Sequence, residues 1–362
     1  MFKYRDKEIA DRIVTKLKEM DLDITLMHVC GGHQDTFIRY GIDSLILDLG
    51  VDIRQGPGCP VCVTPPEEIE EVMLLAQKGK TITVFGDMMR VPGEKFTLFD
   101  MQSRGADVRM VYSIDDAVVI ARDNPGHEVV FMAIGFETTA PSTAAVLSGK
   151  EGLPSNFSIL CTHRLVPPAL KGIVEMGELK LDGLIEPGHV STIIGSTPYE
   201  FLSTEYGVPQ VITGFEPLDL MMAVYQLALQ VNRGEGKLIN GYGRAVRSHG
   251  NLKAIKLMET VFEVCDVSWR GFGVIPASGS RIRKKYEMHD ARVRFEDDLL
   301  ELRGREFTEP KGCRCGEVLR GLIHSHECPL FGKVCTPQNP VGPCMVTSEG
   351  SCNIMLKYGR YG

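Results

Sequence analysis

Long apolar runs are missing from this 362-residue sequence, and no stretch approaches the roughly 20 apolar residues that a membrane-spanning helix needs. The N-terminus, MFKYRDKEIADRIVTKLKEM, also lacks the apolar centre of a secretory signal. Its residues Ile9, Ile13, Val14 and Leu17 instead recur at the spacing of an amphipathic helix. We therefore expect a cytoplasmic protein.

Basic residues are not in excess, and the common nucleotide-binding motifs do not occur. The chain has 40 Lys and Arg against 47 Asp and Glu, which gives a formal charge of -7 and a pI near 5.8. Because the basic residues are scattered, the sequence predicts no positively charged surface that would bind nucleic acid or an anionic membrane. GxGxxG and Walker A patterns are absent, so no nucleotide site is predicted. The expected partners are proteins and small molecules.

Cysteine is what the sequence has in abundance. A chain of this length with 43% hydrophobic residues can bury its own cores, so its 11 cysteines are not needed to hold the fold together. Structural disulfides are not expected in a reducing compartment, and the odd count leaves at least one cysteine without an intramolecular partner. The cysteines also cluster, which indicates metal binding and electron transfer. They are Cys30, Cys59 and Cys62 near the start, Cys161 and Cys265 in the middle, and Cys313, Cys315, Cys328, Cys335, Cys344 and Cys352 near the end.

From about residue 44 to 290, short β-branched runs alternate with helical stretches, which is typical of parallel sheets with crossover helices. The expected strands are 81–86, 107–113, 127–135, 157–163, 183–188 and 209–214, and the expected helices are 66–79, 114–124, 139–150 and 217–234. Gly-Phe-Glu follows a strand at 135–137 and again at 214–216. This echo favours a duplicated half-domain, with chance recurrence of a strand-to-helix turn as the alternative. Both turns fall at strand carboxyl ends, where open α/β sheets bind ligands.

We predict an α/β fold with two similar doubly wound α/β domains and a small cysteine-rich, mostly irregular or helical iron–sulfur domain. An N-terminal helix and the CGGH segment, residues 1–43, should pack with the C-terminal domain. The two α/β domains should span 44–160 and 161–290. Residues 291–362 lack strand or long-helix periodicity and should fold around a 4Fe-4S centre.

The tail contains a CxC followed by gaps of 12, 6, 8 and 7 residues between successive cysteines. Four thiolates can bind zinc or an iron–sulfur cluster, but the CxxC knuckles of structural zinc are absent here, so the wide gaps favour a cluster over zinc. Four ligands leave two cysteines over. Since the two residues of a CxC face one metal only awkwardly, one of Cys313 and Cys315 should be spare, with Cys344 as its partner. Such a pair could collect single electrons and deliver two to a disulfide.

Two further cysteine motifs lie near the N-terminus. Cys59-Pro-Val-Cys62 directly precedes the helix expected from Pro66, which is a thioredoxin-type redox arrangement, with half of a zinc knuckle as the alternative. Cys30 ends an apolar strand at 24–29, and the glycines of CGGH are expected to turn the chain and open space for a bound group. Cys30 would offer a thiolate and His33 an imidazole. The simpler reading is a glycine turn with an incidental cysteine.

Taken together, CGGHQD, GPGCPVC and the CxCGEVLRG…ECPLFG…CTP…MVTSEGSC tail resemble the hydrogenase maturation factor HypD family over essentially the whole chain. This resemblance implies a scaffold that assembles and holds the Fe(CN)2CO group of [NiFe]-hydrogenase, together with the small chaperone HypC and the cyanide donor HypE. It implies mainly an assembly role with a thiol-redox step, and leaves open whether the protein is an enzyme. The alternative is a 4Fe-4S thiol–disulfide oxidoreductase resembling ferredoxin:thioredoxin reductase, which has no need of CGGH.

The resemblance also implies roles for individual residues. Gln34-Asp35 follows CGGH where family members often carry a second histidine, so that imidazole has no counterpart here. His163, Glu186 and His189, at expected strand ends, either line the iron site or cap turns. The implied roles are Cys30 as iron anchor with His33 nearby, Cys59 and Cys62 as a redox pair, Cys313, Cys328, Cys335 and Cys352 as cluster ligands, Cys315 and Cys344 as a second thiol pair, and Glu349 as the acidic residue of the SEG motif.

Overall fold

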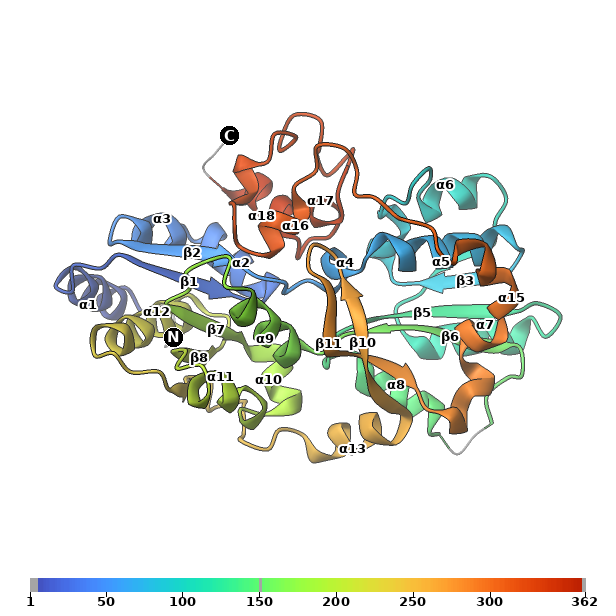
Figure 1. Cartoon of the computed structure of the whole chain (residues 1–362), viewed down its shortest axis with the longest axis horizontal. Coiled ribbons are helices and arrows are strands. Elements are labelled where there is room, and N and C mark those ends of the chain that lie inside the picture. The colour runs from blue at the N-terminus through green and yellow to red at the C-terminus, as the bar shows by residue number, and fades with distance from the viewer. Residues whose placement is uncertain (1–5, 150–151, 360–362) are drawn as a thin grey trace.

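Two parallel β-sheets lie side by side and form the two halves of the protein (Figure 1). The computed structural model describes residues 6–149 and 152–359. One sheet has the strand order β2-β1-β7-β8-β9 and the other β4-β3-β5-β6, with all neighbours parallel. The predicted α/β class with parallel sheets is confirmed. The strands are β1 (Ile24–His28), β2 (Val51–Gln55), β3 (Thr81–Val84), β4 (Val108–Met110), β5 (Val129–Gly135), β6 (Phe157–His163), β7 (Gly183–Pro187), β8 (Gln210–Thr213) and β9 (Leu238–Asn240).

Both sheets are wound in the same way. In each, the first strand has its successor on one side and the later strands on the other, as the orders 2-1-7-8 and 4-3-5-6 show. The strand order reverses between β1 and β7 in one sheet and between β3 and β5 in the other, and such switch points are where doubly wound sheets bind ligands. The two Gly-Phe-Glu turns follow β5 and β8, which take different places in this order. The two halves are therefore alike in their strand order, whereas the repeated Gly-Phe-Glu turn does not mark equivalent positions in them.

Helices connect the strands close to where the sequence predicts them. α5 begins with Pro66 and has Glu67 and Glu68 in its first turn. The first turn of a helix tolerates a residue without a backbone N–H, and negative charge is favoured there. Ser113 and Asp116 cap α7 reciprocally. No helix in the described parts of the chain is both long and apolar enough to cross a bilayer. The principal helices are α1 (Lys7–Lys18), α3 (Ile42–Leu47), α5 (Pro66–Gln77), α6 (Leu98–Ser103), α7 (Ile114–Asp123), α8 (Ala140–Leu147), α9 (Val166–Met176), α10 (Gly188–Ile194), α11 (Glu200–Thr204), α12 (Pro217–Asn232) and α13 (Leu252–Val261).

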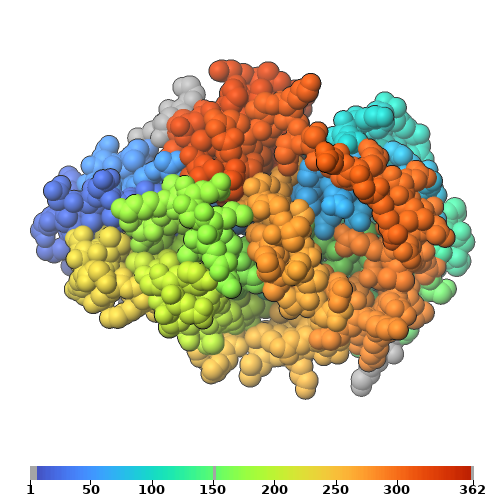
Figure 2. Space-filling model, viewed as in Figure 1, coloured from blue at the N-terminus to red at the C-terminus, as the bar shows by residue number. Residues whose placement is uncertain are grey.

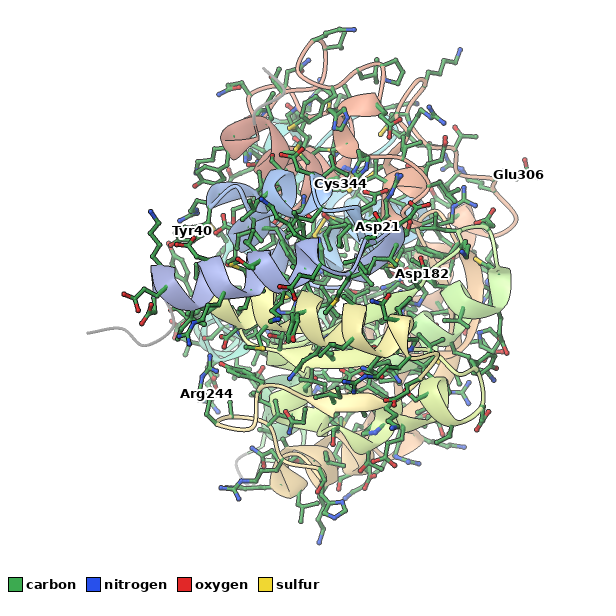
Figure 3. The ribbon with its side chains drawn as sticks, turned by 90° about the vertical axis from the view of Figure 1, so that its left-hand side faces the viewer. Asp21, Tyr40, Asp182, Arg244, Glu306 and Cys344 are labelled. Carbon is green, nitrogen blue, oxygen red and sulfur yellow. A yellow bond between two sulfur atoms is a disulfide. The ribbon has the colours of Figure 1, made fainter. Side chains whose placement is uncertain are left out.

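The sheets do not follow the consecutive ranges 1–43, 44–160 and 161–290 expected from the sequence. β1 and β2 pair with strands from the 183–240 region, whereas the four-stranded sheet takes all its strands from residues 81–163. α1 contacts α12 on the outer side of the five-stranded half (Figure 3). α2 (Gly31–Arg39) contacts α18 (Ser351–Tyr358) of the cysteine-rich tail. The CGGH segment is thus part of one α/β half and touches the tail.

An antiparallel hairpin lies between the halves, where the sequence predicts continued α/β alternation. It consists of β10 (Phe262–Trp269) and β11 (Gly273–Ile282), and the prediction was wrong for this segment. Gly271 and Gly273 adopt positive φ values of 83° and 73° and close the short connection. The Trp269 ring stacks on Phe136, at the end of β5, with 5.9 Å between centroids. The hairpin is therefore fixed to the four-stranded half.

The C-terminal tail consists of short helices joined by irregular chain and covers the junction of the two halves (Figure 2). Its first part is held on α5 by ion pairs from Arg292 to Glu71 at 2.7 Å and to Glu68 at 3.3 Å. The cysteine-bearing part lies above α2 and the short helix that follows β2 (Figure 1). The helices of the tail are α14 (Ala291–Arg294), α15 (Glu296–Leu299), α16 (Cys315–Leu319), α17 (Pro343–Val346) and α18.

Candidate metal and thiol site

Cys30 lies at the switch point of the five-stranded sheet. It follows β1, which is confirmed as an apolar strand, and it caps the N-terminus of α2. β1 has β2 on one side and β7 on the other, so its carboxyl end opens where the strand order reverses. The prediction that Gly31 and Gly32 turn the chain was wrong, because both residues belong to the first turn of α2.

The two glycines of CGGH allow neighbouring segments to approach Cys30 closely. A Cβ atom on Gly31 would lie 2.5 Å from the carbonyl oxygen of Glu349 and 2.7 Å from its Cβ. A Cβ on Gly32 would lie 3.1 Å from the ring of Phe215. Gly31 therefore needs glycine for the lack of a side chain rather than for an unusual backbone angle, and a side chain at Gly32 would have to displace the Phe215 ring slightly.

Replacing Gly31 with alanine should lower the free energy of unfolding by about 1–3 kcal/mol, because the new methyl group overlaps the backbone of Glu349. The helix propensity of alanine would oppose this by up to about 1 kcal/mol. Urea denaturation measures the difference. Gly126→Ala is the matched control, since a Cβ there meets no atom within 4 Å. Equal stability of the Gly31 variant and the wild type would contradict the close contact.

Burial dominates the chemistry of the Cys30 thiol. It raises the thiol's pKa to about 11, against the opposing effect of the backbone amides of His33 and Gly32. The negative charge of Glu349 raises the pKa further. Cys30 is therefore a neutral thiol at physiological pH, and a metal cation must displace its proton to gain a thiolate ligand.

His33 is buried beside Cys30 and is uncharged. Burial lowers its pKa to about 3, neither ring nitrogen has a hydrogen-bond partner, and the ring lies 4.9 Å from that of Phe215. A buried imidazole without hydrogen-bond partners at either nitrogen is costly in an apolar site, and the nearby backbone of Thr213 and Gly214 opposes the lowering of its pKa. Asp35, at the position of the family's second histidine, instead pairs with Arg39 at 2.7 Å. The missing imidazole is thus replaced by a surface ion pair.

Two of the three strand-end residues that the sequence left undecided lie near this site. His189 stacks on Phe215 at 3.9 Å, and so shares that ring with His33. Glu186 is fully buried at the end of β7, with both carboxylate oxygens unpaired, and burial raises its pKa to about 8. His163 instead bonds the Thr143 hydroxyl at 3.0 Å in the other half. Phe215 had no role expected from the sequence, although its place in the second Gly-Phe-Glu turn was the available signal.

Cys59 and Cys62 form a disulfide that directly follows Gly58 in the chain. Cys59 caps the short helix α4 (Pro60–Val63), and its sulfur accepts a hydrogen bond from the Cys62 amide at 3.2 Å. α5 starts at Pro66, as expected for this motif. Gly58 touches the backbone of Cys30 so closely that any Cβ would overlap it. The GPGC segment therefore brings the disulfide against the Cys30 turn.

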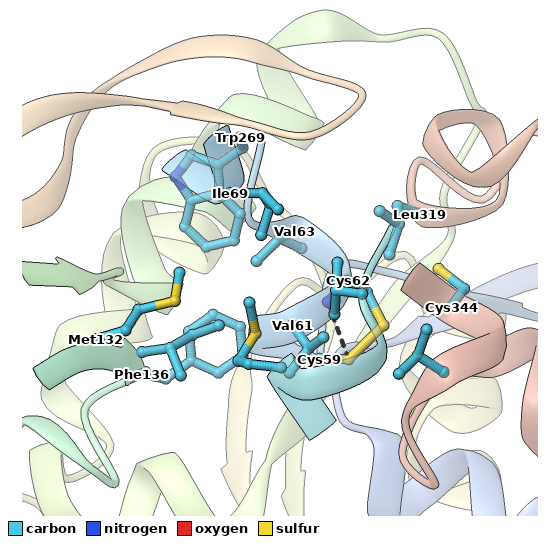
Figure 4. Packing of buried hydrophobic residues seen from close by; sticks show 14 of the residues in the cluster. Cys59, Val61, Cys62, Val63, Ile69, Met132, Phe136, Trp269, Leu319 and Cys344 are labelled. Carbon is cyan, nitrogen blue, oxygen red and sulfur yellow. Dashed lines mark hydrogen bonds between the residues drawn. A yellow bond between two sulfur atoms is a disulfide. The ribbon is translucent and has the colours of Figure 1, made fainter. Parts of the chain in front are cut away.

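Cys315 and Cys344 form a second buried disulfide, which faces the first. Cys315 starts α16 and Cys344 lies in α17, and both helices contact α4. Figure 4 shows Cys344 directed towards the Cys59–Cys62 bond across a buried apolar interface. The spare partner of Cys344, left open between Cys313 and Cys315 by the sequence, is Cys315 in this structure.

The remaining four cysteines of the tail are free and line one small apolar pocket with the second disulfide. Burial raises the pKa of Cys313 to about 11 and that of Cys352 to about 12. Across the described residues, no three His, Cys, Asp or Glu side chains surround a single point as the ligands of one ion do. A 4Fe-4S cluster instead takes its four thiolates at separate corners, which suits four convergent soft donors in an apolar enclosure. The four are Cys313, Cys328, Cys335 and Cys352.

Comparison with known proteins decides the family. The sequence profile of HypD, described as "Hydrogenase formation hypA family", matches residues 5–359. The chain is 46% identical to hydrogenase maturation factor HypD2 of Bradyrhizobium diazoefficiens, over 99% of this chain and 96% of that protein. The hydrogenase maturation factors HypD of Cupriavidus necator and Rhodobacter capsulatus are 43% and 41% identical, over 99% and 98% of this chain and 96% and 97% of those proteins. The chain belongs to the HypD family.

In this HypD family member, a hydrogenase maturation factor, most residues singled out from the sequence meet at the junction of the halves. Cys30 and His33, both disulfides, the four free cysteines and Glu349 converge there. Two cysteines lie elsewhere. Cys161 donates from its thiol to the Ser280 carbonyl at 3.1 Å, and Cys265 lies in β10. These two give matched controls for experiments on HypD cysteines.

Proposed function

We propose that this protein holds the Fe(CN)2CO group at Cys30 while the group is assembled for [NiFe]-hydrogenase. The observation that carries the proposal is the convergence of Cys30, two facing disulfides and four free cysteines on one junction. A scaffold that only bound a partner would not need redox-capable thiols beside a metal-binding thiol. Membership of the HypD family agrees with this reading.

Cys30 is the proposed anchor for the iron cargo. Low-spin iron that carries cyanide and carbon monoxide favours soft, anionic ligands, and the thiolate is the softest donor that a protein offers. The neutral imidazole of His33 lies beside it without another partner and can accept or donate a hydrogen bond to a ligand of the iron. One thiolate from this chain leaves positions for a thiolate of a partner, so that the group is held and can later be released.

Cys313, Cys328, Cys335 and Cys352 are the proposed ligands of a resident 4Fe-4S cluster. When bound, the cluster would supply electrons one at a time. The facing disulfides give this chain a way to carry electron pairs. Thiol–disulfide exchange needs a thiolate with direct access to the other pair's sulfurs, and the contact of α17 with α4 supports such access.

Exchange between the two pairs balances without another reactant. With Cys315 and Cys344 reduced, a thiolate of this pair attacks one sulfur of the Cys59–Cys62 bond and forms a mixed disulfide. The second thiolate then closes Cys315–Cys344 and releases Cys59 and Cys62 as thiols, which take up the two protons. Two electrons thereby move to a position next to the Cys30 turn.

The proposed partners are a small HypC-type chaperone and a HypE-type cyanide donor, and the proposed compartment is the cytoplasm. A chaperone thiolate would complete the coordination that Cys30 begins. Cyanide transfer requires that the donor reach the Cys30 position. His189 is exposed to solvent and stacks on Phe215, whose ring also contacts the buried His33, so the donor would approach from this side.

Replacing Cys344 with serine should abolish hydrogenase maturation and leave the four cluster ligands in place. The change removes one sulfur of the proposed exchange and keeps nearly the same volume. Hydrogenase activity in cells that lack their own HypD, rescued with each variant, measures maturation, and iron and sulfide analysis measures the cluster. Cys265→Ser is the matched control and should rescue like the wild type. Full rescue by Cys344→Ser would remove the second pair from the proposed electron path.

A 4Fe-4S thiol–disulfide oxidoreductase of the ferredoxin:thioredoxin reductase type is the alternative. It would use the same tail and the same disulfides. It would leave unexplained why a buried thiol and an unpartnered imidazole occupy the switch point next to them. Rapid disulfide-reductase turnover that survives Cys30→Ala would favour this alternative.

A further inference from the structure

The connection between the two strands of the hairpin reaches the thiol junction and places an arginine there. Arg270 follows β10, and its backbone amide donates to the carbonyl of Val63, the last residue of α4, at 2.8 Å. The next residue, Gly271, is so close to Gly316 of α16 that a Cβ on Gly271 would lie 2.5 Å from the Gly316 Cα. The tip of the hairpin therefore contacts both the helix of the first disulfide and the helix that begins at Cys315 (Figure 1).

The Arg270 side chain carries a buried positive charge at this tip. Its Nε donates to the Thr64 carbonyl at 2.9 Å, just beyond the end of α4. Nη1 pairs with the Glu309 carboxylate, whereas Nη2 is buried without a partner. A guanidinium stays protonated in proteins, so a buried one needs negative charge nearby to offset the cost of its desolvation.

The ion pair with Glu309 compensates this charge only in part. The Glu309 side chain is 36% exposed against 2% for Arg270, so solvent screens the carboxylate more than the guanidinium. Burial lowers the pKa of Arg270, and the charges of Glu309 and Cys313 oppose this lowering. Cys313 is a neutral thiol when free, since burial raises its pKa to about 11, but a metal ligand must be a thiolate. Metal binding at Cys313 would therefore supply negative charge close to Arg270.

We propose that Arg270 tunes the reduction potential of the cluster that Cys313 would help to bind. This inference rests on the proposed function, which assigns the cluster to the four free cysteines of the tail. Reduction adds one electron from a one-electron donor and one negative charge to the cluster, and no bond forms or breaks. A buried positive charge beside a cluster ligand stabilises the reduced form and so raises the potential. Glu309, the partner of Arg270, acts in the opposite direction.

Potentiometric titration of the full-length protein, purified without oxygen, tests the proposal. Dithionite with dye mediators supplies the electrons, and visible absorbance follows the cluster. Arg270→Gln should lower the equilibrium constant for reduction on the order of tenfold, which is about 59 mV for one electron. Glu309→Gln should raise it, because the buried guanidinium loses the carboxylate that offsets its charge. Arg270→Lys keeps the charge and should restore most of the wild-type potential.

Arg314 provides the matched control for a positive charge near the cluster. It is adjacent to Cys313 in the chain, but its side chain is 40% exposed and is paired with Glu317. Solvent screens an exposed charge, so Arg314→Gln should leave the potential nearly unchanged. A purely structural role of Arg270 would not produce shifts of opposite sign in Arg270→Gln and Glu309→Gln.

Iron and sulfide analysis separates a missing cluster from a missing effect of Arg270. Wild-type protein without iron and sulfide would overturn the cluster and this inference together. With full iron and sulfide content, a potential that Arg270→Gln leaves unchanged would overturn the role of Arg270 alone. If Arg270→Gln does not fold, Glu309→Gln decides, and an absent or downward shift in that variant overturns the role of Arg270.

Discussion

Cys30→Ala is expected to abolish the infrared bands of iron-bound cyanide and carbon monoxide while leaving the fold and the iron–sulfur absorption intact. The reason is that Cys30 offers the soft anionic donor at the switch point, and the adjacent imidazole of His33 is neutral and a weaker anchor. The measurement is infrared spectroscopy of the protein purified together with its small HypC-type partner. Protein does not absorb in the region of these bands.

Two companion variants make this result specific. Cys161→Ala removes an equally buried thiol in the other half and should leave the bands unchanged. His33→Ala should weaken the bands or slow their appearance, because the imidazole adjusts the site without being its principal ligand. If Cys30→Ala kept bands of wild-type intensity, Cys30 would be excluded as the iron anchor.

Cys335→Ala should lose the cluster and loosen the whole tail. Four thiolates hold the proposed cluster, and for a segment with so little regular structure the free energy of metal binding is largely folding free energy, on the order of several kcal/mol. Iron and sulfide content, visible absorbance and thermal unfolding should all change together. Full iron content with unchanged thermal stability would contradict the assignment of Cys335.

Cys315→Ser provides the control inside the same pocket. Cys315 lines the pocket but is paired with Cys344, so its loss should spare the iron and sulfide content. Cys313→Ser, two residues away, should lose the cluster because Cys313 is one of the four free cysteines. If Cys315→Ser lost the cluster and Cys313→Ser kept it, the assignments of Cys313 as cluster ligand and Cys315 as disulfide partner would be reversed.

Most strands of the two sheets, and the helices expected from residues 66, 114, 139 and 217, were predictable because their signals are local, whereas helices such as α3, α9 and α13 were not predicted. The expected strand 157–163 matches β6, and the helix expected from residue 66 starts there, since proline and acidic residues mark its first turn. β2 was missed because VDIRQ is short and polar at alternate positions. The β10–β11 hairpin had a signal, two β-type runs separated by three residues with Gly271 between them, which the repeating α/β pattern overshadowed.

The cysteines of the candidate site could be identified from their spacing, but their surroundings could not. Gly31 and Gly32 disfavour helix by propensity, yet they form the first turn of α2, where a Cβ on Gly31 would overlap the backbone of Glu349 and one on Gly32 would crowd the ring of Phe215. Those contacts join residues about 180 and 320 positions apart, which no local pattern encodes.

The interleaved order of the two sheets determines when the Cys30 position proposed to hold iron can first form during synthesis. The four-stranded sheet has all its strands once residue 163 has emerged from the ribosome, but β1 must wait for β7, and Gly31 must wait for Glu349. Domains made of one continuous stretch can fold as they are made, whereas this thiol position draws on both ends of a long interval. A nascent chain therefore lacks the finished Cys30 position until residue 349 has been added, and partly made copies would be unable to hold the proposed iron cargo.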